Sequence, residues 1–229
     1  MDYNLINAKI IQIYKDYNIH SFPVNCLDLV KKFNISLYPY SQLDGKLLEY
    51  CMKCSDDAYC YKNKIFFNDT ISKSRINFSL MHELGHIVLV HGDIHTPQKE
   101  QEANYFSSHI LAPRMAIHYS GCKNHIHVAK QFNVSIEAAD IAFNDYRRWH
   151  RRAVYKMDSF DKAMYSHFYN EEIKGFAYSV KKCKLCGKEL INTGQDACPS
   201  CRVRLSPRFD AYEDENFHMA ESHWLYGGL

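Results

Sequence analysis

Residues 80–92 read LMHELGHIVLVHG, an apolar stretch in which His82 and His86 flank Glu83. In an α-helix, residues i and i+4 project from one face, so the two histidines can direct their imidazoles at one metal ion. Glu83 would lie beside that ion, where its carboxylate can accept a proton from a water molecule. The stretch therefore predicts a zinc-binding helix.

The same stretch carries the signals of a helix. Its apolar residues recur at helical spacing, Ser72 or Ser74 can cap the start, and Gly92 can end the run. The competing interpretation is a core helix whose two histidines are satisfied by protein partners. Because H-E-x-x-H is rare in a chain of this composition, we favour metal binding.

A catalytic zinc ion usually has three protein ligands and one open position, so a third ligand must come from elsewhere. A second helix is predicted between Thr96, a good N-cap, and Pro113. On a helical wheel Glu100 lies nearer its apolar stripe than Glu102 does, so we choose Glu100 and keep Glu102 as the alternative. Asn104, one turn later, could orient a ligand.

Four elements are predicted upstream of the metal-binding helix. They are helices over residues 3–17 and 25–33, a strand over 35–40, and an edge strand over 61–69. An edge strand just before such a helix could pair with an extended substrate. Residues 43–60 show no clear pattern.

Length and composition indicate an ordinary globular protein. The 229 residues are 46% hydrophobic and 24% charged, and the formal net charge of +2 gives no global field that would select a polyanion. The N-terminus is polar, and no apolar run approaches the roughly 20 residues that span a bilayer. We expect a cytoplasmic protein without a membrane partner, whose nine cysteines are thiols or metal ligands.

Residues 183–201, CKLCGKELINTGQDACPSC, contain two C-x-x-C pairs. This pattern predicts a zinc ribbon, a small module held together by a structural zinc ion with no open position. Its four predicted ligands are Cys183, Cys186, Cys198 and Cys201. Cys51, Cys54 and Cys60 offer three further thiols, which we interpret as free cysteines rather than a third zinc site.

Charge is uneven near the C-terminal end. Residues 173–209 contain eight Lys or Arg and two acids, whereas 210–229 contain five acids and no Lys or Arg. A basic ribbon is suited to nucleic acid or to a partner protein. The acidic, aromatic tail could fold back on it.

Residues 70–115 resemble the ImmA/IrrE family of zinc metallopeptidases, in which an arginine–phenylalanine lead-in precedes H-E-x-x-H and an E-x-x-A-N-x-F helix ends near a proline. Ser107, Ser108 and Ala112 depart mildly from the usual pattern. The likeness extends weakly over residues 1–150 and implies a gluzincin-like fold with Glu100 as third ligand. It also implies site-specific cleavage of a helix-turn-helix repressor of a phage or mobile element. The matching residues are Arg75, Phe78, His82, Glu83, His86, Glu100, Ala103, Asn104, Phe106, Leu111 and Pro113.

We therefore predict an α+β fold with a small mixed sheet, the H-E-x-x-H helix and the following glutamate helix in a zincin-like domain over 1–121. A helix-turn-helix-like pair packed on it follows over 122–152, then a linker or connecting helix over 153–180. The zinc ribbon and acidic tail occupy 181–229.

The helix pair ends in four arginines, a composition suited to phosphate contacts. Its second helix, however, begins with Ile136, Glu137 and Ala138, which are poor residues for reading bases. Ala139 and Ile141 could pack back on the first helix. We therefore interpret the pair as a packing element.

The predicted function is a zinc endopeptidase with one catalytic and one structural zinc ion, in which Glu83 is the general base. Tyr105, His109 and His91 are candidate oxyanion stabilisers, although each is also a candidate structural residue. The alternative is a non-catalytic DNA- or protein-binding regulator that uses the peptidase-like fold and the ribbon for docking.

Overall fold

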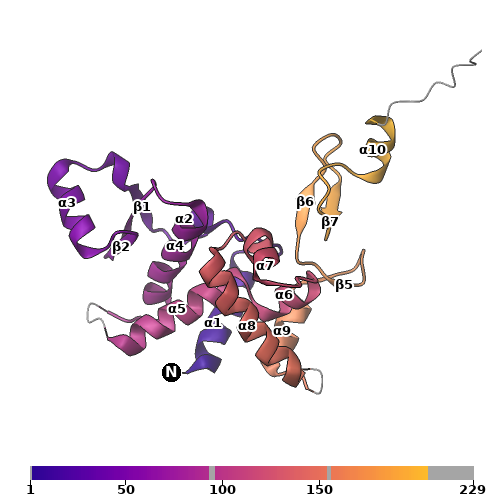
Figure 1. Cartoon of the computed structure of the whole chain (residues 1–229), viewed down its shortest axis with the longest axis horizontal. Helices are drawn as coiled ribbons and strands as arrows, with labels where there is room; N and C mark the ends of the chain where they lie inside the picture. Colours follow the sequence, from indigo (N-terminus) through magenta and orange to yellow (C-terminus); the bar gives the residue numbers. More distant parts are fainter. Residues whose placement is uncertain (1, 93–95, 154–155, 206–229) are drawn as a thin grey trace, which may run out of the picture. The chain divides into compact units, whose positions relative to one another are not determined.

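The computed structural model describes residues 2–92, 96–153 and 156–205, and its chain divides into two units (Figure 1). Unit 1 consists of Met1–Lys181 and Ile191–Thr193, and unit 2 of Lys182–Leu190 and Gly194–Leu229. The predicted acidic tail, 210–229, lies outside the described residues. Among the helices that are described, none is both long and apolar enough to cross a membrane.

Unit 1 contains a three-stranded sheet in the order β1-β3-β2. β3 (Lys64–Phe67) runs parallel to β1 (Ser36–Pro39) and antiparallel to β2 (Ala58–Tyr61). The prediction of an edge strand over 61–69 is therefore wrong, because β3 is central. Ile65, Phe66 and Phe67 are all buried, as a strand covered on both faces requires, and the lysines lie only at its start. β2 is an edge strand instead.

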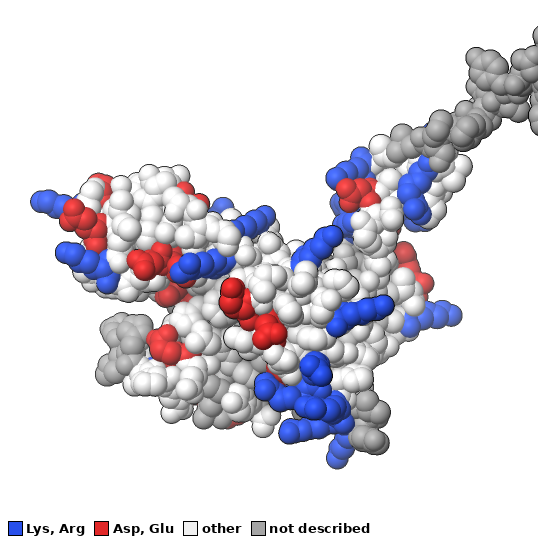
Figure 2. All heavy atoms as spheres, viewed as in Figure 1, with Lys and Arg blue, Asp and Glu red and all other residues white. Residues whose placement is uncertain are grey.

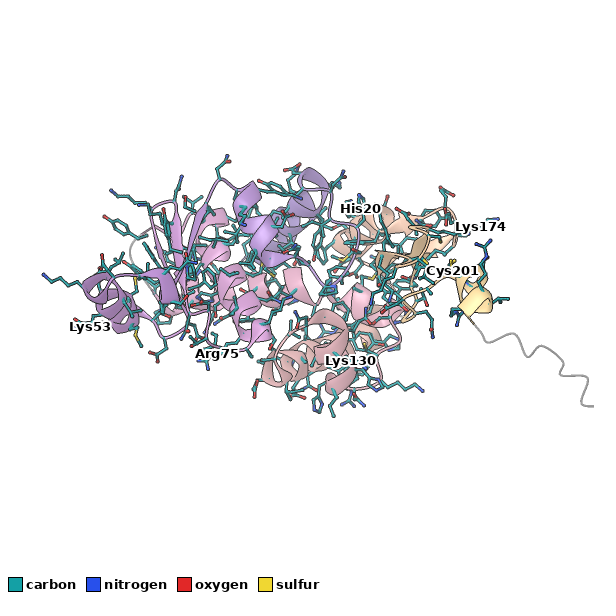
Figure 3. All side chains as sticks on the ribbon, turned by 90° about the horizontal axis from the view of Figure 1, so that it is seen from above. His20, Lys53, Arg75, Lys130, Lys174 and Cys201 are labelled. Atoms are coloured by element: carbon teal, nitrogen blue, oxygen red, sulfur yellow. The ribbon has the colours of Figure 1, made fainter. Side chains whose placement is uncertain are left out.

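Residues 43–60, which showed no clear pattern, form α3 (Gly45–Cys54) and most of β2; the 3₁₀ turn η1 (Tyr40–Gln42) precedes α3. Cys51 on α3 is fully buried against Tyr40 and Phe66. Within unit 1, Figure 3 shows Lys53 on α3 far from Lys130 on α7. α3 and η1 thus pack on a small core of their own, formed by Tyr40, Cys51 and Phe66.

Two adjacent helices carry the residues predicted to bind metal. α4 (Lys73–Val88) begins after Ser72, whose side chain accepts a hydrogen bond from the Arg75 N–H. α5 (Pro97–Leu111) begins after Thr96 in the same way, with proline in its first turn. Buried Leu80, Leu84 and Phe106 are among the residues that join the two helices to the main core.

The remaining helices of unit 1 surround that core. They are α1 (Tyr3–Asp16), α2 (Cys26–Lys32), α6 (Arg114–Tyr119), α7 (His125–Phe132), α8 (Ile136–Ala153) and α9 (Ser159–His167). A hairpin of β4 (Tyr169–Asn170) and β5 (Gly175–Phe176) follows α9. Phe160, Met164, Phe168 and Phe176 are buried in the main core, so the part of 153–180 that is described does not form a linker. Phe160, Met164 and Phe168 recur every four residues, a spacing typical of a packed helix, whereas Phe176 lies on β5.

α7 and α8 form the predicted helix pair. Asn133 adopts a left-handed conformation (φ 52°) at the turn, and the Ser135 hydroxyl accepts a hydrogen bond from the Ala138 N–H. Ala139 is fully buried, as expected for a residue that packs back. Ile141 is 64% exposed, contrary to the prediction, because it lies on the opposite side of α8 from the packed face.

Unit 2 is a small module around four cysteines. β6 (Val180–Lys182) pairs with β7 (Glu189–Ile191), and α10 (Pro199–Leu205) follows the second C-x-x-C pair. Its buried cluster consists of Cys183, Leu190, Cys198 and Cys201, with Ala197 packed against them. Apart from Leu190, the described module therefore has almost no apolar core.

Candidate metal centres

His82, His86 and Glu100 bring three ligand atoms together at the interface of α4 and α5. His82 Nε2 lies 3.1 Å from both His86 Nε2 and one Glu100 oxygen, and His86 Nε2 lies 3.5 Å from the other. Tetrahedral ligands at normal zinc distances are about 3.3–3.4 Å apart. The donor set therefore fits one zinc ion, and a fourth position is left for water or substrate.

Close packing of the two helices makes this cluster possible. Gly85 lies on the α4 face that meets α5, where an added Cβ would come within 3.0 Å of the Phe106 ring and 3.3 Å of the Ala103 Cα. A larger residue would therefore push α5 away. The glycine of the sequence HELGH holds the Glu100 helix at the distance that the three ligands require.

Glu102, the alternative ligand, points elsewhere. Its carboxylate lies 3.2 Å from His91 Nε2 and accepts a hydrogen bond from the Gln98 side chain. His91 Nδ1 in turn lies 2.9 Å from His86 Nδ1. When His86 Nδ1 carries a proton, it donates a hydrogen bond to His91 Nδ1, and His91 Nε2 donates one to Glu102. His86 Nε2 then keeps a lone pair that can bind the ion.

The other histidine of the cluster is oriented in the same manner. His82 Nδ1 lies 3.0 Å from the side-chain oxygen of Asn104, which can accept its proton. Asn104 thus has the contact expected of a residue that orients a metal ligand. Both imidazoles are fixed by a partner on the nitrogen that faces away from the cluster.

The C-terminus of α4 places His91 beside His86. The N–H of His91 donates to the His86 carbonyl and the N–H of Val90 to that of Ile87, the two hydrogen bonds of a Schellman motif. Val90 has φ 56°, a conformation that usually requires glycine. This turn ends the helix at Val88, before the predicted stop at Gly92.

Glu83 is half-buried beside the cluster. Burial raises the pKa of its carboxyl to about 7, and the neighbouring Glu100 carboxylate adds to this, whereas a hydrogen bond from the Cys60 N–H opposes it. A proton acceptor whose pKa lies near neutrality is suited to general acid–base catalysis. Cys60 belongs to β2, so the edge strand contacts the Glu83 carboxyl directly.

The cluster opens into a cavity of about 700 Å³. His82, Glu83, His86 and Glu100 line it together with residues of β2 and the end of α3. Sequence reasoning missed this second wall, because residues 43–60 carry no recognisable periodicity. The residues of that wall are Cys54, Ser55, Asp57, Ala58, Tyr59 and Cys60.

Residues 31–144 match the family model described as the IrrE N-terminal-like domain, a peptidase family. The chain belongs to this family. The match includes the three-stranded sheet, α4 and α5 with the histidine–glutamate cluster, and part of α8. The IrrE-like domain is thus metallopeptidase-like, which confirms the family resemblance and the α+β fold. A search of curated proteins gave no match.

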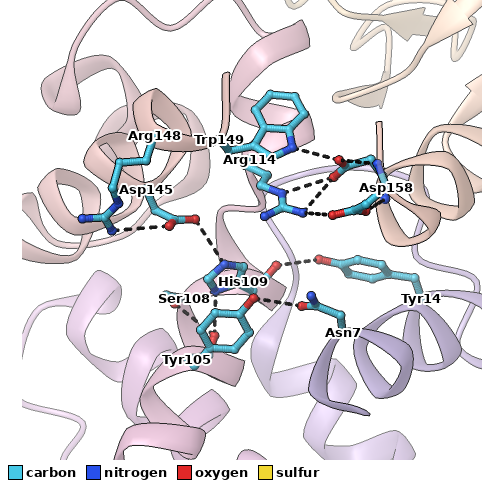
Figure 4. A network of polar contacts seen from close by, with 11 residues as sticks. Asn7, Tyr14, Tyr105, Ser108, His109, Arg114, Asp145, Arg148, Trp149 and Asp158 are labelled. Carbon is cyan, nitrogen blue, oxygen red and sulfur yellow. Dashed lines mark hydrogen bonds and ion pairs between the residues drawn. The ribbon is translucent and has the colours of Figure 1, made fainter. Parts of the chain in front are cut away.

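The three candidate oxyanion stabilisers do not line the cavity of about 700 Å³ that contains Glu83 in the IrrE-like domain. His91 contacts His86, as described above. Tyr105 donates its hydroxyl hydrogen to Asn7 and stacks on His109, whose Nε2 lies 3.4 Å from Asp145 (Figure 4). These side chains connect α1, α5 and α8, so the structure does not support an oxyanion role for them.

The four ribbon cysteines form the second cluster. All four sulfurs lie within 4.8 Å of one another, and Cys186 and Cys198 are 3.7 Å apart. Sulfurs at the corners of a zinc tetrahedron are about 3.7–3.8 Å apart, so the donor set fits a closed Cys₄ site. Cys201 lies at the start of α10 (Figure 3).

The ribbon thiols influence one another. Hydrogen bonds from backbone N–H groups, that of Cys198 first, lower the pKa of Cys183 to about 6. Hydrogen bonds with Cys186 and Cys198 raise the pKa of Cys201 to about 12. Four sulfurs this close cannot all be thiolates without a cation to balance their charge.

Two groups of His, Cys, Asp or Glu side chains could each hold a metal ion within the described residues. They are the histidine–glutamate cluster and the four ribbon cysteines. Cys51, Cys54 and Cys60 do not form a further group of this kind in the part of the chain that the structure describes. Cys54 and Cys60 nevertheless line the cavity of the first cluster.

Proposed function

We propose that unit 1 is a zinc-dependent endopeptidase. The observation that carries the proposal is the set of three ligand atoms at tetrahedral spacing, with a carboxylate of raised pKa beside them in an open cavity. A zinc ion in that position would act as a Lewis acid and make water a nucleophile near neutral pH.

His82, His86 and Glu100 would hold the ion, and Asn104 and His91 would fix the two imidazoles. Glu83 would accept a proton from the attacking water and return it to the leaving amine. In the described sheet β2 is an edge strand and lines the cavity next to Glu83, so it is suited to hold an extended substrate chain by backbone hydrogen bonds. We assign no oxyanion stabiliser, because none of the three candidates lines the cavity that contains Glu83.

The substrate proposed from the family resemblance is a protein, a helix-turn-helix repressor of a phage or mobile element. We also place the enzyme in the cytoplasm, because none of the nine cysteines, all of which are described, forms a disulfide. Unit 2, held by its own zinc ion, exposes Lys182, Lys188 and Arg204 and is suited to an acidic partner such as a nucleic acid.

The experiment compares the wild-type chain with Glu83→Gln on a helix-turn-helix repressor that the wild-type chain cleaves. We expect cleavage to fall by a factor of about 10²–10⁴, because the proton acceptor is lost. The zinc content, measured by mass spectrometry, should not change. Glu49→Gln, an exposed glutamate on α3, is the matched control. A Glu83→Gln variant that cleaves at the wild-type rate would overturn the mechanism.

A further inference from the structure

A second cavity of about 1060 Å³ lies beside the first in unit 1. Asp57, Phe78, Ser79 and Asn104 line both cavities, so the two form one continuous depression. It starts at the histidine–glutamate cluster, follows the N-terminal half of α4, and ends between α1, α5 and α8. We call its distal part the α8 groove.

Apolar and aromatic side chains form part of the walls of the α8 groove. On one side Tyr3 packs on Tyr105 with ring centroids 4.7 Å apart. On the other side Ala138 and Ala142 of α8 leave a hollow because their side chains are small, and Ile141 is 64% exposed. An exposed isoleucine beside a hollow is a typical feature of a binding site for an apolar side chain.

Most charged residues of the α8 groove are already paired within the protein. Arg75 lies 2.8 Å from Asp57, and Arg114 lies 2.7 Å from Asp158. Asp145 contacts both His109 and Arg148, so one polar network links α5 to α8 (Figure 4). The walls are therefore fixed before a ligand binds, and the paired charges do not select a strongly charged one.

α8 is the second helix of the helix-turn-helix-like pair, the position of a recognition helix in DNA-binding proteins. Its basic residues gather at its C-terminal end (Figure 2), where Arg147, Arg151 and Arg152 are exposed. Its N-terminal half instead carries Glu137 and Ile141 into the groove. This half is suited to a polypeptide rather than to a phosphate backbone.

We propose that the α8 groove binds the substrate polypeptide on one side of the scissile bond, with a bulky apolar side chain packed on Ile141. This inference rests on the proposed peptidase function. It assigns substrate selection to α8, a helix that takes no part in metal binding. The α8 groove adjoins the cavity that contains Glu83. Its natural occupant is therefore another stretch of the polypeptide that the enzyme cuts.

The test selects peptides from a random display library on the zinc-loaded, full-length Glu83→Gln protein. We expect enriched peptides that share a bulky apolar residue. Ile141→Lys, added to Glu83→Gln, should weaken their binding at least tenfold. The matched control is Ile126→Lys on α7, which is 57% exposed and does not line the groove, and it should leave binding unchanged.

The outcomes separate the two proposals. Enriched peptides that bind Ile141→Lys as tightly as the parent, or an absence of enrichment, overturn the α8 groove as a peptide site. Peptides that depend on Ile141 but are not cut by the wild-type enzyme support the groove and contradict the peptidase function. Binding of a short DNA duplex that Ile141→Glu abolishes, without loss of peptide binding, would assign α8 to nucleic acid.

Discussion

The histidine–glutamate cluster of unit 1 and the four-cysteine cluster of unit 2 share tetrahedral ligand spacing but differ in what surrounds it. In unit 1 the ligand helices pack through buried Leu84 and Phe106 into a large core. In unit 2 the buried cluster consists of three of the ligands, Cys183, Cys198 and Cys201, together with Leu190. The first cluster is thus positioned by the fold, whereas the second has to create its fold by binding metal.

The largest effect is expected from Cys198→Ser. Structural zinc contributes about 10–16 kcal/mol of apparent binding free energy in small zinc modules, so losing one ligand should unfold unit 2. Limited proteolysis should then cut within residues 182–205 while unit 1 stays intact, and one zinc ion should be lost. Cys122→Ser, outside both clusters, is the control. An intact Cys198→Ser ribbon would remove the contrast between the clusters.

A core substitution should have the opposite pattern. Phe106 is fully buried against Gly85, and Phe106→Ala should lower the free energy of unfolding of unit 1 by about 3–5 kcal/mol. Chemical denaturation of the zinc-free protein measures this change. In the zinc-loaded protein, protection of unit 2 from protease should be unaffected, and a loss there would show that the two units do not depend on different forces.

The hydrogen-bonded chain behind His86 can be tested next. His91→Ala should weaken zinc binding at the first cluster about 10–100-fold, because His86 loses the partner on its second nitrogen. Glu102→Gln should have a smaller effect, since it keeps an acceptor for His91. A competition titration with a chromophoric chelator gives the affinities. Exposed His127→Ala serves as the control, and equal affinities in all variants would mean that His91 only fills space.

Gly85→Ala should be mildly destabilising. The methyl group would come within 3.0 Å of the Phe106 ring, a strain of about 1–3 kcal/mol that the better helix propensity of alanine offsets by about 1 kcal/mol. Zinc affinity should fall as well, because α5 is displaced. Gly45→Ala on α3 is the matched control, because a Cβ there meets no atom within 4 Å. Higher stability of Gly85→Ala would contradict close helix packing as the reason for the glycine.

The smallest effect is expected at the turn after α4. Val90 is 85% exposed with φ 56°, so Val90→Gly should relieve about 1–2 kcal/mol of strain. Glycine also gains entropy in the unfolded chain, about 0.5–1 kcal/mol, so a net gain of about 0.5–1 kcal/mol is expected in thermal unfolding. A loss of stability would mean that the valine side chain contributes packing absent from this structure.

Both ligand sets were predictable from sequence, because each depends on local spacing. His82 and His86 share a face of any helix, and each C-x-x-C pair brings two sulfurs together in a tight turn. Glu100 was preferred to Glu102 from its position on the helix, and its carboxylate does reach the two histidines. Cys54 and Cys60 in the cavity wall carried no comparable signal.

The errors share a different origin. β3 was assigned to a sheet edge from its flanking lysines. Residues 153–180 were assigned to a linker or connecting helix from their lack of motifs, and their described part packs into the main core as α9 and a hairpin. Ile141 was expected to pack back on α7. Each error concerns which partner lies across a strand or helix, and residues far apart in the sequence decide that.

The sequence by itself determined the chemistry. It places two histidines on one helix face, a glutamate near the apolar stripe of the next helix, a proton acceptor beside the histidines, and four thiols in two pairs. Only the tertiary structure decided the environment, which includes the contact of Asn104 with His82, the cavity wall from β2, and the groove between α5 and α8. The physical reason is the separation along the sequence of the residues that interact. Periodicity fixes how side chains project from one element, whereas the distance between elements depends on packing contacts such as Gly85 against Phe106.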